Sequence, residues 1–301
     1  MNRIAFAVLH YCKLELTTRC VDSLLLLDVP KDTVVDIIIV DNNSPDDSGF
    51  ELEERYKNND KITLIKSRDN LGFAKGNNLA FYAMKDELYD FGIFLNNDTE
   101  IIQKDFLFQL IALKNSDVAL WSVDVFDPAV GQHQSPLCDG SELIEYAKRE
   151  HLGKQKVLNC SFLNKLLLNI KAYLAKIAFV TPFFRKAVIC YLIKSIPQSQ
   201  WEAYRQNIVP CGAAVVFSKH FLQSMPYAFY PGTSMYFEEC ILKLLCDRKG
   251  LITAHNPDLQ VLHHHHRISV HYFDKFLYSH LAKEAHLYEE SYEVLLTLLN
   301  Q

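Results

Sequence analysis

The sequence predicts an α/β fold in which a mixed, mainly parallel sheet is covered by helices on both faces. Short apolar runs rich in Ile and Val alternate with segments of helical periodicity over residues 4–98, a pattern typical of βαβ units. The predicted strands are IAFAVLH, VVDIIIVD, ITLIKS and FGIFLNND, and the predicted helices are LTTRCVDSLLLL, FELEERYKN and GNNLAFYAMKD. With 301 residues, 49% of them hydrophobic, the chain can form one large core or two fused half-domains.

Composition excludes some functional classes. The net charge of −5 gives no general excess of cations, so we expect no nucleic-acid partner. The eight cysteines contain no CxxC pair, which predicts reduced, buried thiols. The first apolar stretch is too short for a signal sequence and lacks a small-residue cleavage site, so we expect a buried first strand and a cytoplasmic protein.

Three polar segments directly follow predicted strands. They are residues 41–44, 70–78 and 96–98. Ligands of open α/β sheets bind beyond the carboxyl ends of the strands, so we expect all three segments on one rim.

The segment FLNNDTE ends a strand with Asn96, Asn97 and Asp98. Asp98 either binds a divalent cation, which prefers oxygen ligands, or caps a helix that begins near Ile102. Asn96 and Asn97 suit contacts to a ribose hydroxyl or to a metal-bound water.

The segment DNNS has the same position after the second strand. Asp41, Asn42, Asn43 and Ser44 either form a turn before Pro45 or contact the base and ribose of a nucleotide.

The run NLGFAKGNNLA combines glycines with polar side chains. Gly72 and Gly76 permit close backbone approach where a helix begins, and Asn70, Lys75 and Asn77 lie beside them. The run is not a GxGxxG fingerprint, which disfavours a dehydrogenase.

From about residue 128 the pattern becomes irregular, and a basic segment follows. Residues 151–201 contain no Asp or Glu. Their cations are Lys154, Lys156, Lys165, Lys171, Lys176, Arg185, Lys186 and Lys194. Neither apolar run in this segment reaches the roughly 18 uncharged residues of a membrane span. Two interpretations stay open: a helical insertion or homodimer face with solvated lysines, or a basic amphipathic helix over 154–194 on an anionic membrane surface.

The last third returns to alternating elements. IVPCGAAVVFSKHFL predicts a strand, a turn and a helix, and MYFEECILKLLCDRKG predicts a helix that ends at Gly250. A further strand precedes a C-terminal helical pair over residues 272–300. We therefore divide the chain into residues 1–127, residues 128–256 with a basic insertion at about 151–201, and residues 257–301.

Taken together, DNNS, NLGFAKGNN and LNND resemble the large inverting family 2 of glycosyltransferases with the GT-A fold, especially its rhamnosyltransferase-like branch in bacterial surface polysaccharide synthesis. The resemblance covers residues 4–125 and, more weakly, 208–270. It implies that residues 1–127 bind the nucleotide-sugar, that residues 128–256 bind the acceptor, and that residues 257–301 complete the site. It implies a Mn²⁺- or Mg²⁺-dependent enzyme that moves a sugar from a UDP- or dTDP-sugar to a glycan or lipid-linked acceptor. It also implies a cytoplasmic enzyme. If residues 154–194 lie on a membrane, that enzyme is peripheral on the inner face of the plasma membrane.

The resemblance implies roles for individual residues. Asp41 corresponds to the contact with the nucleotide base, and Asp98 with Asn96 corresponds to the metal-binding DxD motif, whose first acid is Asn96 here. The residues expected to bind the donor are Tyr11, Asp41, Asn43, Asn70, Gly72, Lys75, Asn77, Asn96 and Asn97.

The run Phe237, Glu238 and Glu239 resembles the family's F-E-D segment, whose last acid is the general base. This implies Glu239 as the base, with Glu238 as the alternative; charge at a helix N-terminus is a purely structural explanation. The family's later Asp and Arg are replaced by Ile241 and Leu245.

Two further segments complete the predicted site. In the run His263 to His266, alternate side chains of a strand point to one face, and the resemblance implies that His264 or His265 assists the metal. Gly212 and Ala213 either leave room for an acceptor sugar or pack a strand tightly against a helix.

Two other functions fit the same fold. A sugar nucleotidyltransferase normally has a Gly-rich basic loop after the first strand, and LHYCKLELTT has none. A catalytically silent sugar- or nucleotide-binding module is the second alternative, because Ile241 and Leu245 replace polar residues.

Overall fold

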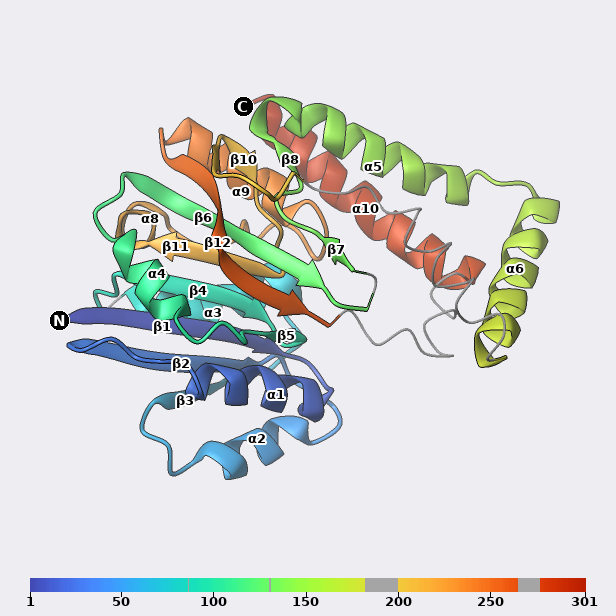
Figure 1. The fold of residues 1–301 in the computed structure, drawn as a ribbon. Coiled ribbons are helices and arrows are strands. Elements are labelled where there is room, and N and C mark those ends of the chain that lie inside the picture. The colour runs from blue at the N-terminus through green and yellow to red at the C-terminus, as the bar shows by residue number, and fades with distance from the viewer. Residues whose placement is uncertain (86, 130, 182–199, 265–276) are drawn as a thin grey trace.

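In the computed structural model, a single mixed sheet forms the centre of the molecule (Figure 1). The structure describes residues 1–301 except 86, 130, 182–199 and 265–276. Within that part of the chain the sheet has ten strands, eight of them in the order β3-β2-β1-β4-β11-β6-β12-β5, with β7 beside β6 and β9 beside β12. These strands are β1 (Asn2–His10), β2 (Thr33–Asp41), β3 (Ile62–Lys66), β4 (Phe91–Asn96), β5 (Thr99–Glu100), β6 (Val118–Asp127), β7 (Gln132–His133), β9 (Arg205–Gln206), β11 (Ala214–Ser218) and β12 (Ile252–His263).

The first half of the sheet is parallel and the second is mixed. Strands β1 to β4 pair in parallel, β11 runs antiparallel between β4 and β6, and β12 is parallel to β6. The two halves of the chain therefore share one continuous sheet. A separate two-stranded sheet pairs β8 (Cys138–Asp139) with β10 (Ile208–Val209).

Helices cover both faces because alternate strand residues point to opposite sides. One face carries α1 (Leu14–Leu25), α2 (Ser48–Tyr56) and α4 (Phe106–Ala112), packed on residues such as Phe6 and Ile39. The other carries α3 (Gly72–Lys85), α8 (Lys219–Ser224) and α9 (Glu238–Arg248), packed on residues such as Ala7 and Val40. The predicted α/β fold is confirmed.

A helical layer lies beyond the end of the sheet. After the short 3-10 turn Gly140–Glu142, α5 (Leu143–Leu158) packs along α10 (Tyr278–Leu299), and both pack on α9 in a third core. Helix α6 (Phe162–Val180) continues from α5 and lies at the far end of the α5–α10 pair, away from the sheet (Figure 1). No helix in the described ranges is long and apolar enough to span a bilayer.

Two expected elements differ from the structure. The C-terminal helical pair is, in the described residues, the single helix α10, whose mixed buried positions contact both α5 and α9. The helix expected near Ile102 begins at Phe106, because Thr99 and Glu100 first pair with β12. Asp98 is therefore not a helix cap.

Candidate active site

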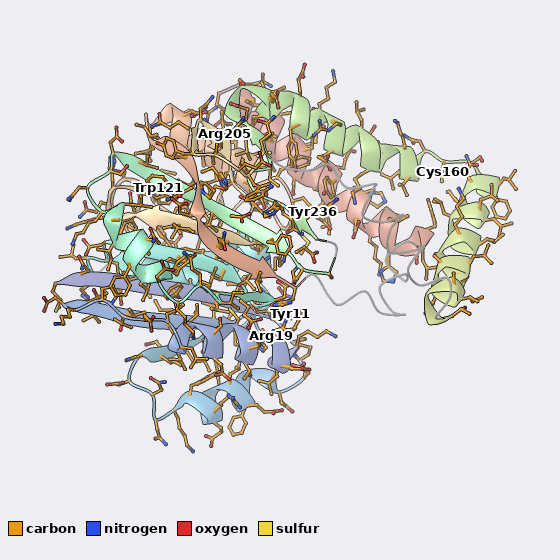
Figure 2. The ribbon with its side chains drawn as sticks, viewed as in Figure 1. Tyr11, Arg19, Trp121, Cys160, Arg205 and Tyr236 are labelled. Atoms are coloured by element: carbon orange, nitrogen blue, oxygen red, sulfur yellow. The ribbon has the colours of Figure 1, made fainter. Side chains whose placement is uncertain are left out.

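The three predicted polar segments do lie on one rim of the sheet. Residue 41 ends β2, residue 96 ends β4, and α3 begins at Gly72, after β3. Strands β1, β2, β3 and β4 are parallel neighbours, so their carboxyl ends lie at the same edge. Tyr11 follows β1 at this edge on the α1 side, and Tyr236 lies at the same end of the molecule on the α10 side (Figure 2).

Asn42 fixes the donor loop and was missing from the predicted site. Its Oδ1 accepts from the Leu71 N–H at 2.9 Å, and its Nδ2 donates to Asn70 Oδ1 at 3.0 Å and to the Gly72 carbonyl at 3.2 Å. Asn42 is buried, whereas Asn43 beside it is exposed with φ 60°. The buried amide thus shapes the loop that starts α3, and its position directly after β2 is a signal that sequence reasoning had available.

The remaining predicted donor residues have different surroundings. Asp41 Oδ1 accepts from the Ser44 N–H at 3.1 Å and from its hydroxyl at 2.7 Å, so the expected turn forms. Lys75 is exposed, whereas Asn77 is buried and donates to the Phe73 carbonyl of its own helix at 3.0 Å. The geometry does not test contact with a nucleotide for any of them.

A buried relay holds Asn97, and sequence reasoning missed its members. Asn97 Nδ2 donates to Thr17 Oγ1 at 3.0 Å, Thr17 Oγ1 lies 2.6 Å from His10 Nδ1, and His10 Nε2 lies 2.8 Å from Ser48 Oγ. The Ser48 hydroxyl donates to Asp46. Burial lowers the pKa of His10, so the ring is neutral and its tautomer is set by these partners. The relay joins the ends of β1 and β4 to α1 and α2.

Asp98 lies in the link between β4 and β5, beside His263 at the end of β12 and His264 directly after it. His263 Nε2 is 3.2 Å from Asp98 Oδ1, and the Asp98 carbonyl accepts from the His264 N–H at 2.8 Å. The His264 ring instead bonds to Glu100 Oε2 at 2.7 Å. Of the two histidines expected to assist the metal, His264 therefore has its ring on Glu100, and His265 lies outside the described residues. The described imidazole on Asp98 belongs to His263.

His263 is itself oriented by Gln134. Its Nδ1 lies 2.8 Å from Gln134 Oε1, which leaves Nε2 directed at Asp98. A hydrogen bond on the far nitrogen is the usual way in which proteins fix the tautomer of a metal-binding histidine. Gln134 lies in the irregular segment after β7, where no sequence pattern points to it.

One short stretch of backbone connects the Asp98 region to the predicted base. The Ala213 carbonyl accepts from the Asn96 N–H at 2.9 Å, and the Gly212 N–H donates to Glu239 Oε1 at 3.1 Å. A Cβ at residue 212 would lie 2.2 Å from that carboxylate oxygen. A side chain at residue 212 would therefore displace the Glu239 carboxylate, which is a third explanation for this glycine beside the two expected from sequence.

Glu238 and Glu239 occupy the first turn of α9 in different environments. Glu238 is 3% exposed, and its Oε1 has no hydrogen-bond partner among the described residues. Burial, together with the smaller effect of the adjacent Glu239, raises its pKa to about 8. Burial also raises the pKa of Glu239, although the Gly212 N–H opposes this effect. A helix terminus alone would lower both pKa values, so the dipole does not account for this pair.

The backbone before α9 is strained. Tyr236 has φ 76° and Phe237 has φ 61°, values that bulky residues rarely adopt. Helix α10 holds this segment, because the Tyr288 ring stacks on Tyr236 with centroids 4.0 Å apart and Ser291 Oγ donates to the Met235 carbonyl at 2.7 Å.

These parts surround a cleft of about 430 Å³. Its walls include Asn96, Gly212, Glu238, Glu239, His263 and Tyr288. Burial raises the pKa of Tyr146 and Tyr288, so both phenols in its wall stay protonated. The cleft therefore combines carboxylates, an imidazole and aromatic rings.

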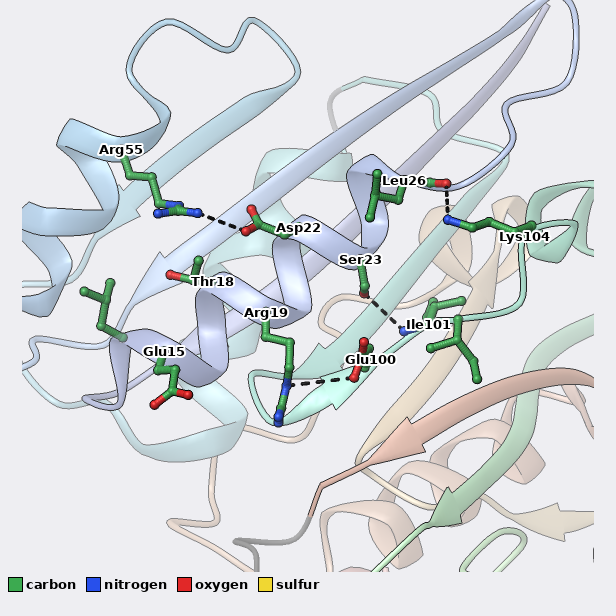
Figure 3. Close-up of a pocket in the computed structure, with 12 residues that line it drawn as sticks. Glu15, Thr18, Arg19, Asp22, Ser23, Leu26, Arg55, Glu100, Ile101 and Lys104 are labelled. Carbon is green, nitrogen blue, oxygen red and sulfur yellow. Dashed lines mark hydrogen bonds and ion pairs between the residues drawn. The ribbon is translucent and has the colours of Figure 1, made fainter.

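A larger hollow of about 670 Å³ lies outside the rim, between α1 and residues 100–104 (Figure 3). Its charges are paired: Arg55 Nη2 contacts Asp22 Oδ2 at 3.0 Å, and Arg19 Nε lies 3.9 Å from Glu100 Oε2. We place the active site in the smaller cleft, where carboxylates are buried instead of neutralised.

The residues at Asp98 suit a divalent cation that carries a diphosphate. Among the described residues, no group of three or more His, Cys, Asp and Glu side chains could hold a metal. A cation bound to substrate phosphates takes one or two protein carboxylates, and Mn²⁺ also accepts imidazole. Asp98 and His263, 3.2 Å apart, fit that requirement.

The sequence matches the family model of glycosyl transferase family 2 over residues 7–169, more than half of the chain. The chain belongs to glycosyl transferase family 2. The match includes the rim of this glycosyltransferase from Tyr11 to Asp98, and it ends before α9. A search among curated proteins finds no match.

Solved structures show the same fold as this glycosyltransferase. TarS 1–349 from S. aureus shares 13% identity over 94% of this chain and 71% of its own, with a TM-score of 0.54. Mannosyltransferase PcManGT from Pyrobaculum calidifontis, in complex with GDP-Man and Mn²⁺, shares 13% over 95% and 69%, with a TM-score of 0.53. TarS 1–349 in complex with UDP shares 12% over 93% and 70%, also at 0.53. In another TarS structure the match covers 43% of that chain. The GT-A fold is thereby confirmed.

Proposed function

We propose that this family 2 glycosyltransferase is an inverting, metal-dependent enzyme that transfers a sugar from a UDP- or dTDP-sugar to a glycan or lipid-linked acceptor. The observation that carries the proposal is the backbone of residues 211–213, which bonds to Asn96 beside Asp98 and to Glu239. A leaving-group site and a general base are thus held in one cleft.

The donor nucleotide binds at the rim formed by the carboxyl ends of β1 to β4 in this proposal. The loop that Asn42 shapes presents Asn70, Gly72 and Lys75 beside the turn of Asp41, where we place the nucleotide. The complexes of similar fold with UDP and with GDP-Man support a nucleoside diphosphate at this edge. The choice of uridine or thymidine as the base of the donor is proposed from the sequence resemblance.

For the metal, the proposal assigns Asp98 as the principal carboxylate and His263 as its neighbour, with Asn96 and Asn97 beside them. A cation held there supplies neutralisation of the charge that develops on the diphosphate leaving group. The Mn²⁺ in the PcManGT complex supports a divalent cation. The metal-assisting role expected of His264 or His265 from sequence stays a prediction.

For the base, the proposal favours Glu239 over Glu238. Glu238 is buried and its pKa of about 8 keeps it protonated at neutral pH. Glu239 is less buried, and the Gly212 N–H stabilises its charged form. The acceptor hydroxyl loses its proton to Glu239 as its oxygen attacks C1, and the bond between C1 and the diphosphate oxygen breaks on the opposite side. This in-line exchange inverts the anomeric centre.

For the acceptor, the proposal uses the wall of the cleft formed by α5, α9 and α10. Tyr146 and Tyr288 present aromatic rings and protonated hydroxyls, which suit the apolar face and the hydroxyls of a sugar. We further propose a cytoplasmic enzyme of the rhamnosyltransferase-like branch that acts in surface polysaccharide synthesis.

Two variants test the proposal by separating binding from chemistry. We expect Asp98→Ala to abolish Mn²⁺-dependent binding of UDP and dTDP in titration calorimetry. Glu239→Gln should keep that binding and lose transfer by about 10²- to 10⁴-fold, the usual contribution of a general base. Metal-dependent affinity that is unchanged in Asp98→Ala would contradict the metal assignment. Wild-type protein that binds nucleotide without hydrolysing or transferring any nucleotide-sugar would instead indicate a silent binding module.

A further inference from the structure

The outward face of α6 is apolar. At 100° per residue, eight large side chains lie within one continuous arc, and all are exposed, from 42% for Leu167 to 83% for Phe162. They are Phe162, Leu163, Leu166, Leu167, Ile170, Tyr173, Leu174 and Ile177. A helix on a folded domain normally turns this face to the core.

The inward face of α6 carries the half-buried Leu168 together with small and polar residues. Ala172 is buried, Asn169 Oδ1 accepts from the Tyr278 N–H at 2.8 Å, and Lys165 Nζ lies 4.6 Å from the Tyr278 ring centroid. The start of α10 thus fixes the rotation of α6 by polar contacts. The apolar arc points outward because of these contacts, and contiguous exposed apolar surface of this kind marks an interaction site.

The charge around this arc has one sign. Residues 151–201 contain no acidic residue, and Lys171 and Lys176 flank the two edges of the arc in the helical projection. Long lysine side chains at such edges reach from an apolar interface to anionic groups. Two acids of α10 pair with α5 instead of α6: Glu284 with Lys154, and Glu289 with Gln155.

We propose that α6 lies on an anionic lipid surface, with its apolar arc in the headgroup region and its lysines on the phosphates. A second copy of the chain is the less favoured occupant, because it would bring two segments without acidic residues against each other. Binding itself is independent of the proposed activity. What membrane binding implies for the acceptor rests on the proposed function. Helices α5 and α10 form one wall of the cleft, and α6 lies at their far end (Figure 1). With α6 on the membrane, the acceptor is a sugar carried on a lipid.

Flotation with lipid vesicles tests the proposal without substrate. We expect the full chain to float with vesicles of equal parts phosphatidylglycerol and phosphatidylcholine, more weakly with pure phosphatidylcholine, and less as salt rises. The double variant Leu166→Asp with Leu174→Asp should lose flotation. Lys171→Gln should weaken it about fivefold at low salt, the contribution expected of one cation near an anionic surface.

A matched pair controls for added charge. Ile102→Asp with Phe108→Asp replaces two side chains of similar exposure, 60% and 50%, far from α6. This variant should float like the parent chain. Nucleotide binding in solution should be the same in the parent and in the α6 variant, so loss of flotation with intact nucleotide binding supports the proposal even where transfer fails.

Two results would overturn it. The first is equal flotation of the α6 double variant and the parent chain. The second is a parent chain that is dimeric in sedimentation without lipid and becomes monomeric in the α6 variant while neither floats, which would assign the arc to a second copy.

Discussion

The donor rim and the acceptor side of the cleft are built in different ways. The rim places its residues at or just after the ends of the first four strands, within residues 10–98. The acceptor side collects Gly212, Glu239 and Tyr288 from three distant segments. The family match stops between the two, at residue 169. Strand ends can thus bring polar residues together within one short stretch of chain, whereas the α5–α10 side of the cleft depends on long-range packing.

The largest expected effect concerns the buried acid of the acceptor side. Because burial raises the pKa of Glu238 from 4.5 to about 8, folding favours its protonated form. That stabilisation is complete below pH 4.5 and is lost as pH rises through 8, by about 1.4 kcal/mol for each pH unit between the two values. Glu238→Gln should remove this dependence and be more stable than the parent chain at pH 9. Urea unfolding at pH 6 and pH 9 measures it, and parallel pH profiles for the two chains would contradict it.

A methyl group at residue 212 tests the connection between the two regions. Gly212→Ala places a Cβ 2.2 Å from Glu239 Oε1, so the carboxylate must move. A misplaced base should reduce kcat about 100-fold with little change in nucleotide affinity.

Gly153→Ala provides the matched control, because a Cβ at residue 153 in α5 contacts nothing within 4 Å. It should leave kcat unchanged and stabilise the helix by about 0.5–1 kcal/mol. Equal kcat values for the two alanine variants would show that Gly212 does not position the base.

The smallest effect belongs to the donor rim. Asn42→Ala leaves the Leu71 N–H without its partner and should cost about 1–3 kcal/mol of stability, with a higher KM for the donor and an unchanged kcat. Ser67→Ala serves as the control, since its hydroxyl bonds only within the exposed neighbouring loop. A fall in kcat at constant KM would place Asn42 in the chemistry instead of the loop.

Sequence reasoning found the rim more completely than the acceptor side, and the reasons are physical. Strand ends are visible from apolar runs, so Asp41, Asn70 and Asp98 could be placed on one edge. His10 and Asn42 occupy the same kind of position, but they hold other segments in place through hydrogen bonds, and a single polar letter does not reveal those partners. Gln134 and Tyr288 reach the cleft through long-range packing that leaves no periodic trace. His263, whose ring lies beside Asp98, was not among the histidines chosen from sequence, because β12 pairs with β5 in a register fixed only by the folded sheet.

The left-handed backbone at Tyr236 and Phe237 has a consequence for how the molecule loses activity. Each such residue costs on the order of 1–3 kcal/mol, and the described contacts that resist relaxation come from the last helix of the chain. We expect that detachment of α10 relaxes this backbone and moves Glu239 away from the Gly212 N–H, while the ten strands of the sheet stay paired. We therefore expect the geometry around Glu239 to be lost at a lower temperature than the sheet that carries the rim.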